Sequence, residues 1–250
     1  MGCWEFVRYG DYIDVAYVSN SLQPVVSSAT ITIGGEAHRF RIAADGPGPY
    51  HAGQLAFPSQ SVVTWKFTLF AGIERGAHDD REIYELPFAT SEAVRVSQAY
   101  DGPRTHRGEH RYAIDFSLPV GTPVQAARAG TVALVVDLPC PDEAGTGCRN
   151  VRVDVRHADG SYASYQHLKP GSIAVAEGDG VAVGATLALS GNSGRSRGPH
   201  LHFQVYTPTP DGEFIVASLP TAFRTASGVL QLEADRAYTR PVSAASSGAE

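Results

Sequence analysis

Residues 190–205 read SGNSGRSRGPHLHFQV and join a loop of Gly, Ser and Asn to a segment in which polar and apolar residues alternate. Side chains two positions apart on a β-strand point to the same face of the sheet. We therefore expect His200 and His202 to project together, roughly 6–7 Å apart, while the apolar residues between and after them enter a core. Imidazole is a common metal ligand and also an acid or base near neutral pH. The pair indicates a site beside a glycine-rich loop; the alternative is two surface histidines.

The composition is that of a loop-rich globular protein. The chain has 250 residues, 43% of them hydrophobic, with 26 Gly, 16 Pro and a single Met. Long runs of helix-forming residues are absent, so we expect an all-β fold. No apolar run approaches the roughly 18–20 residues that a transmembrane helix needs. The net charge of −6 and the dispersed basic residues argue against a nucleic-acid partner.

Strand patterns divide the chain into two predicted domains. Residues 1–95 contain short alternating segments at 12–18, 29–33, 37–42 and 62–70, with Gly34-Gly35 closing a hairpin, and are expected to form a small β-sandwich. Residues 96–235 contain strand-like segments at 112–118, 123–126, 130–138, 151–157, 162–167 and 187–189, and predict an antiparallel β domain. Residues 236–250 are rich in Ser, Ala and Gly and are expected to be a flexible tail.

The cysteines bear on the compartment. Cys140 and Cys148 bracket a turn-rich segment between two expected strands, so a disulfide at this hairpin tip is predicted, which favours an oxidising compartment. Cys3 is left over. The N-terminal MGCWEFVRYG lacks the basic and apolar regions of a signal peptide, so either the numbering starts after signal removal or export uses another route. We expect a periplasmic or secreted protein that is a monomer.

Other residues of the second domain could join the two histidines. Asp115 lies in the apolar strand YAIDF, where a buried carboxylate without a partner would be costly; the alternative is a solvent-facing side chain. On one continuous strand His110 and Asp115 would point to opposite faces. His106 has a loop and Gly108 between it and Asp115, and is the better candidate for a shared site. His167 ends the predicted strand at 162–167.

These residues lie in motifs that resemble the catalytic domain of lysostaphin-type (LytM-like) zinc endopeptidases, the peptidoglycan DD-metallopeptidase family. The motifs are HRYAIDFSLPVGTPVQAARAGTV, YASYQHL and GDGVAVGATLALSGNSGRSRGPHLHFQV, and the resemblance covers about residues 100–206. It implies a catalytic domain that hydrolyses peptide bonds in the stem or cross-bridge peptides of bacterial peptidoglycan.

The resemblance also implies the roles of individual residues. One Zn²⁺ would be held by Asp115, His202 and a histidine upstream of Asp115, while His167 and His200 would be catalytic residues that do not bind the metal. The compact family pattern has a His four residues before the Asp, where this chain has Arg111. We therefore assign His106, in a segment like the longer family form, with His110 as the weaker alternative. Competing readings are a non-catalytic peptidoglycan-binding or activator module with the same fold, and a zinc peptidase of non-wall peptides.

Overall fold

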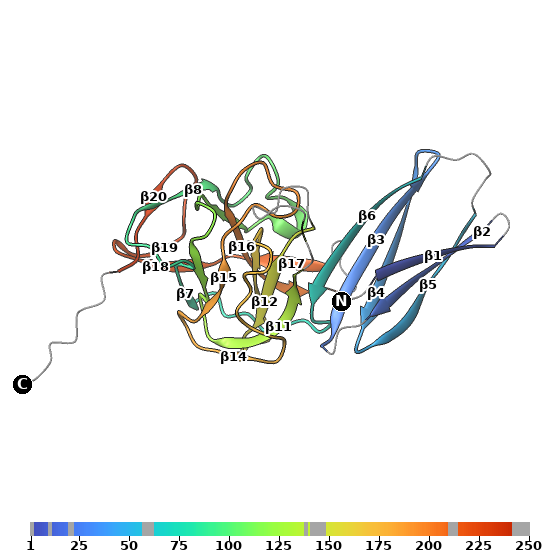
Figure 1. The fold of residues 1–250 in the computed structure, drawn as a ribbon, viewed down its shortest axis with the longest axis horizontal. Helices are drawn as coiled ribbons and strands as arrows, with labels where there is room; N and C mark the ends of the chain where they lie inside the picture. Colours follow the sequence, from blue (N-terminus) through green and yellow to red (C-terminus); the bar gives the residue numbers. More distant parts are fainter. Residues whose placement is uncertain are drawn as a thin grey trace, which may run out of the picture. The chain divides into compact units, whose positions relative to one another are not determined.

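The computed structural model describes residues 3–9, 12–19, 23–56, 63–137, 140, 149–209 and 215–241, and its regular elements are almost all β-strands (Figure 1). The chain divides into two compact units, Met1–Gly76 with Thr207–Ala217, and Ala77–Tyr206 with Ser218–Glu250. The prediction of an all-β protein is therefore confirmed. In the described part of the chain, no helix has the length and apolar character needed to cross a membrane.

The first unit is built from two three-stranded antiparallel sheets. One has the order β1-β2-β5 and the other β4-β3-β6, with bounds Cys3–Tyr9 (β1), Tyr12–Ser19 (β2), Val25–Ile33 (β3), Glu36–Ala44 (β4), Gly48–Ala56 (β5) and Val63–Ala71 (β6). Val15 of β2, Leu55 of β5 and Ile31 of β3 share one buried cluster, so the two sheets face each other across a core as in a sandwich. The hairpin at Gly34-Gly35 is confirmed, since β3 and β4 pair antiparallel on either side of it.

A long, mainly antiparallel sheet organises the second unit, with the order β14-β11-β12-β13-β16-β9-β8-β20. Two smaller sheets have the orders β10-β15 and β19-β18-β7. The bounds are Ile83–Glu85 (β7), Val94–Gln98 (β8), Ile114–Phe116 (β9), Pro123–Gln125 (β10), Gly130–Val136 (β11), Arg152–Arg156 (β12), Tyr162–Gln166 (β13), Gly180–Val181 (β14), Thr186–Leu189 (β15), Leu201–Pro208 (β16), Val216–Leu219 (β17), Ala222–Thr225 (β18), Gly228–Leu230 (β19) and Ala237–Tyr238 (β20), with a single 3-10 turn at Gly108–His110 (η1) among the described residues.

Strand β16 anchors this sheet because its apolar residues fill the core on one face. Phe203 is fully buried and its ring lies 5.3 Å from Tyr165, 5.5 Å from Phe223 and 6.2 Å from Tyr84. Aromatic pairs at such separations add to the free energy that burial itself supplies. The alternation expected from the sequence therefore holds, and it turns the polar residues of β16 to the opposite face.

Three sequence predictions differ from, or lie outside, what the structure describes. Residues 77–95 fall in the second unit rather than the first, because β7 pairs with β18 and β8 pairs with β9. Part of the expected tail, Ala237–Tyr238, forms β20 and pairs with β8, whereas residues 242–250 lie outside the described residues. Cys148 also lies outside them, so the Cys140–Cys148 disulfide stays a prediction.

Candidate metal centre

One row of polar residues crosses the main sheet on the face opposite the aromatic core. Gln98 of β8 is the register partner of Asp115 in β9, Asp115 is the partner of His202 in β16, and His202 is the partner of Gln166 in β13. Directly opposed residues of antiparallel strands project to the same side of the sheet. The pairing of four strands thus brings a carboxylate and an imidazole together although they lie far apart in the sequence.

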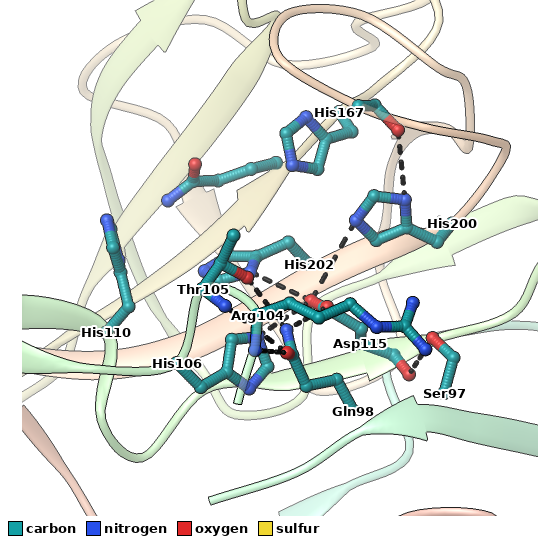
Figure 2. Close-up of polar contacts among 12 residues, drawn as sticks. Ser97, Gln98, Arg104, Thr105, His106, His110, Asp115, His167, His200 and His202 are labelled. Carbon is teal, nitrogen blue, oxygen red and sulfur yellow. Dashed lines mark hydrogen bonds and ion pairs between the residues drawn. The ribbon is translucent and has the colours of Figure 1, made fainter. Parts of the chain in front are cut away.

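A third group completes this cluster from a loop. His106, fully buried, places Nε2 3.1 Å from Oδ1 of Asp115, while Nδ1 of His202 lies 2.9 Å from the same oxygen (Figure 2). The potential ligand atoms of the three residues all lie within 4.8 Å of one another, and all three residues are buried. The sequence had placed these three residues together, and the structure brings them to one point.

The protonation pattern of the three residues fits a metal ion. Nδ1–H of His106 donates to the carbonyl oxygen of Ala99 at 2.8 Å, and Nε2–H of His202 donates to the side-chain oxygen of Gln204 at 3.1 Å. Each neutral ring then turns its lone pair toward the carboxylate of Asp115, and Nε2 of His106 has no hydrogen-bond partner. Three acceptor atoms at such separations require a cation among them, either a proton or a metal ion. Ligands of a tetrahedral zinc site lie roughly 3.3 Å apart, close to the 3.1 and 2.9 Å between Oδ1 of Asp115 and the two imidazole nitrogens.

Gln98 holds both the carboxylate and the loop that carries His106. Its Nε2 donates to Oδ2 of Asp115 at 3.0 Å and to Oγ1 of Thr105 at 2.7 Å. Its Oε1 accepts from the backbone N–H groups of Arg104 at 3.0 Å and Thr105 at 3.3 Å. The side chain is buried, with 4% of the residue exposed. Gln98 therefore fixes two of the three potential ligands, which is how outer groups commonly orient metal ligands.

His167 and His200 lie side by side next to the cluster (Figure 2). Their ring centroids are 4.6 Å apart, and Nε2 of His200 lies 3.8 Å from Oδ1 of Asp115. Nδ1–H of His167 donates to the carbonyl oxygen of Ser193 at 2.7 Å, and Nδ1–H of His200 donates to that of Gly198 at 2.8 Å. In the neutral form each ring therefore keeps Nε2 as an acceptor for a proton.

The backbone conformation of His167 is unusual, because its φ of 63° lies in the left-handed region. The side-chain oxygen of Asn150 accepts a hydrogen bond from the N–H of His167 at 2.9 Å, and Nδ2 of Asn150 donates to Gln166 at 2.7 Å. Such local strain is held by surrounding contacts and is often found at functional sites.

The electrostatic environment sets opposite protonation states for Asp115 and His167. Burial alone would raise the pKa of Asp115, but the adjacent His106 and His202 outweigh it and hold the pKa far below its ordinary value. Burial, together with the neighbouring imidazoles of His200 and His202, lowers the pKa of His167 to about 3. Asp115 is thus an anion and His167 a neutral imidazole at neutral pH.

His110, the alternative first ligand, lies beside the cluster in the 3-10 turn η1. Its Nδ1 is 2.7 Å from the side-chain oxygen of Gln204, and its ring centroid is 5.4 Å from that of His202. The group of residues whose ligand atoms converge contains His106 and not His110. The chain is not one continuous strand before Asp115, because the 3-10 turn η1 precedes β9. Either histidine would need such a break to share a site with Asp115.

Several polar residues at the site were not found from the sequence. Gln204 carried a usable signal, since it lies two positions after His202 on a strand. Gln98 and Asn150 carried none, because their partners come from elements distant in the chain. Ser193 contributes through its backbone carbonyl, which no side-chain pattern reveals.

Residues 109–214 match the family model described as Peptidase family M23. The chain is 33% identical to the peptidoglycan DD-endopeptidase ShyA of Vibrio cholerae over 132 residues, which is 51% of this chain and 28% of ShyA. It is 31% identical to the DD-carboxypeptidase/endopeptidase Mpg of Neisseria meningitidis over 51% of this chain and 28% of Mpg. The chain therefore spans less than a third of the length of these relatives.

Among solved structures, the catalytic domain of EnpA from Enterococcus faecalis, described as a prophage-encoded M23 protein, is similar to the chain. The sequences are 29% identical, and the match covers 54% of this chain and 92% of that domain with a TM-score of 0.40. The matched family segment contains Asp115, His167, His200 and His202, while His106 lies just before it. Residues 109–214 are therefore similar to the domain of peptidase family M23.

Proposed function

We propose that this protein is a zinc-dependent endopeptidase that hydrolyses peptide bonds in the stem or cross-bridge peptides of bacterial peptidoglycan. The observation that carries the proposal is the convergence of His106, Asp115 and His202, with the His167–His200 pair beside them. Two imidazoles and one carboxylate leave a fourth position open, as in catalytic rather than structural zinc sites. The peptidoglycan substrate is proposed from the name of ShyA.

His106, Asp115 and His202 would hold the ion through Nε2, a carboxylate oxygen and Nδ1. Bound zinc lowers the pKa of its water to about 7 and polarises a carbonyl group. Nε2 of His167 and of His200 would then orient or deprotonate the water, stabilise the developing oxyanion and return a proton to the leaving amine. The carbonyl oxygens of Ser193 and Gly198 support these roles by fixing the tautomer in which Nε2 is the free acceptor.

Separate variants test the two groups of histidines. His167→Ala and His200→Ala should each abolish cleavage of purified peptidoglycan while about one zinc per chain remains bound. His202→Ala should lose the metal as well as the activity. His51→Ala, at an exposed position of β5, is the matched control and should retain both. Zinc content by atomic emission and release of soluble muropeptides are the measurements. Loss of zinc from His200→Ala would show that ligand and catalyst were interchanged.

The choice of first ligand has its own test. We assign His106, so His106→Ala should lose zinc, whereas His110→Ala should keep it and bind it less tightly, because His110 shares Gln204 with His202. A crystal structure with anomalous data at the zinc edge would give the ligands directly. A metal bound to His110 instead of His106 would overturn the assignment.

Substrate and location complete the proposal. We propose that the protein acts outside the cytoplasm, in the periplasm or after secretion, because peptidoglycan lies there, and that it works as a monomer. Cleavage of muropeptides but not of casein would support a wall substrate, and equal cleavage of both would point to a peptidase of ordinary proteins. Binding of peptidoglycan without any zinc-dependent cleavage would identify a non-catalytic module instead.

A further inference from the structure

Five basic residues lie close in the sequence to residues of the candidate site, and we call them the cationic rim: Arg104, Arg107, Lys169, Arg195 and Arg197. Arg107 follows His106 directly, and Lys169 lies two positions after His167. Arg195 and Arg197 flank Ser196, whose hydroxyl is 3.2 Å from Nδ1 of His200. Each basic residue is therefore at most three positions in the sequence from a residue of the site. The four arginines are exposed and Lys169 is half-buried.

Arg104 is tied to the site by its backbone. Its N–H donates to Oε1 of Gln98, the side chain that also binds Asp115. Arg104 is thus held two positions before His106, and its side chain is exposed.

The rim residues differ in pairing from other basic residues of the second unit. Within the described part of the chain, none of the five has an acidic group within ion-pair distance. Elsewhere in that unit arginines are commonly neutralised: Arg81 pairs with Asp79 at 2.8 Å, Arg111 with Asp101 at 2.8 Å, Arg128 with Asp159 at 2.7 Å and Arg224 with Glu85 at 2.9 Å. The five rim charges are therefore available to a ligand, in a chain whose net charge is −6.

We propose that the cationic rim binds free carboxylates of the substrate peptide, so that the site selects acidic cross-linked stem peptides over uncharged bridges such as oligoglycine. This inference rests on the proposed function and narrows its substrate class. Guanidinium groups match the planar geometry of a carboxylate and bind it through two parallel hydrogen bonds. Unpaired charges of one sign around a site also raise the local concentration and association rate of oppositely charged substrates.

The binding test uses one preparation of cross-linked stem peptides with free carboxylates, half of which is converted to the carboxamides. The two halves share backbone, cross-link and length, so they differ in charge. Fluorescence anisotropy on zinc-loaded His200→Ala protein measures binding without turnover. The carboxylate form should bind about tenfold more tightly than the carboxamide form at low salt, and the difference should shrink as salt is added.

Rim variants locate the effect. Arg195→Gln/Arg197→Gln, made in the same background, should reduce the preference for the carboxylate form about three- to tenfold and leave binding of the carboxamide form unchanged. Arg156→Gln is the matched control. Arg156 is exposed at the end of β12 opposite Tyr162, whereas Arg152 at the other end lies opposite Gln166, beside the site. This control should keep the full preference.

The outcomes separate this inference from the proposed function. Equal binding of the two peptide forms would overturn the proposal that the rim binds carboxylates. An equal loss of the carboxylate preference in the Arg156→Gln control would also overturn it. If the protein prefers carboxylates but cleaves neither form, carboxylate binding by the rim is supported and the proposed endopeptidase activity is overturned. If wild-type protein cleaves both forms with equal kcat/KM, the proposed endopeptidase activity is supported and carboxylate selection by the rim is overturned. Tighter binding of polyphosphate than of the peptide, lost in the rim variants, would assign the rim to a phosphate polymer and also overturn the inference.

Discussion

At the scale of single residues, Gln98 shows how little of the site resides in the metal ligands alone. One amide side chain donates to Asp115 and Thr105 and accepts from two backbone N–H groups of the His106 loop. Four hydrogen bonds that orient Asp115 and the His106 loop therefore come from a residue that would not touch the ion. The arrangement of His106 and Asp115 is therefore as dependent on Gln98 as on their own strands and loops.

Replacing Gln98 with Ala should weaken zinc binding about 10–100-fold. The variant frees Oδ2 of Asp115 and leaves the N–H groups of Arg104 and Thr105 without their acceptor, so both ligand-bearing segments lose their orientation. Competition with a chromophoric chelator measures the affinity. Gln54→Ala, on an exposed position of β5, is the control and should bind zinc as the wild type does. Wild-type affinity in Gln98→Ala would show that the loop and Asp115 are positioned without it.

The sequence pointed to residues that the structure brings together where motif and spacing agreed, and it gave no signal where long-range strand pairing decides. His200 and His202 were found because a strand repeats every two residues, and His106 because a loop with Gly108 separates it from Asp115. Gln98 could not be found, since its role follows from the register of β8 against β9. The proposed catalytic role of His200 and the proposed ligand roles of His106 and His202 stay predictions that the variants above would test.

At the scale of elements, the glycines of the loop between β15 and β16 have a packing reason. A Cβ on Gly191 would lie 2.5 Å from the backbone nitrogen of Lys169, and a Cβ on Gly194 would lie 2.8 Å from Cα of Asn150. Gly194 also has a φ of +75°, which L side chains rarely adopt. The loop therefore passes close to the segments that hold His167. At these two positions the close approach of the backbone therefore requires glycine.

Gly194→Ala should lower the free energy of unfolding by about 1–3 kcal/mol and reduce activity, because it strains the backbone and pushes against Asn150, which holds the N–H of His167. Gly198→Ala is the matched control in the same loop. A Cβ at Gly198 meets no atom within 4 Å, and this glycine does not have the positive φ of Gly194, so stability should be unchanged. Urea unfolding and muropeptide release measure the two effects. An equal response of both variants would contradict the packing explanation.

The sequence predicted central strands better than edges and connections. The expected strand at 162–167 corresponds to β13 (Tyr162–Gln166), which pairs antiparallel with β12 across the turn at Asp159-Gly160. These segments have continuous apolar or alternating patterns because the sheet buries them. Strands β14 and β20 have two residues each and no periodicity to detect. The predicted boundary at residue 95 cut through β8 and left β7 in the first unit. The partner of β7 is β18, far along the chain, and the partner of β8 is β9, which lies beyond the loop that contains His106.

At the scale of the whole molecule, a buried histidine outside the candidate site makes the free energy of unfolding depend on pH. His157 is 3% exposed, and its Nδ1–H donates to the carbonyl oxygen of Ala129 at 2.9 Å. Burial, with the nearby Arg128 and His78, lowers the pKa of His157 to about 4, although the hydrogen bond to Ala129 and the charge of Asp159 act in the opposite direction. The folded pKa lies below that of an unfolded histidine, about 6.5. Between pH 6.5 and 4 the unfolded chain binds more protons, so stability falls as the pH falls through this window.

We expect His157 to lower the free energy of unfolding by about 2 kcal/mol when the pH falls from 7 to 5. His157→Asn should be less stable at pH 7 and should lack this part of the pH dependence. Urea unfolding of metal-free protein at the two pH values measures it, since metal-free samples avoid competition between protons and zinc at the ligands. His51→Asn, at an exposed position, should keep the wild-type dependence. The same pH dependence in His157→Asn and wild type would assign the loss to other groups.

The row from Gln98 through Asp115 and His202 to Gln166 has a consequence for the order of events during synthesis. No short stretch of the chain holds the three proposed ligands, since His106 and His202 are separated by most of the second unit. A nascent chain therefore cannot assemble the centre until β16 has been made and has docked between β9 and β13. A hydrolase that matures in this way stays inert while it is being made, and uptake of the ion would mark the moment at which its last central strand is in place.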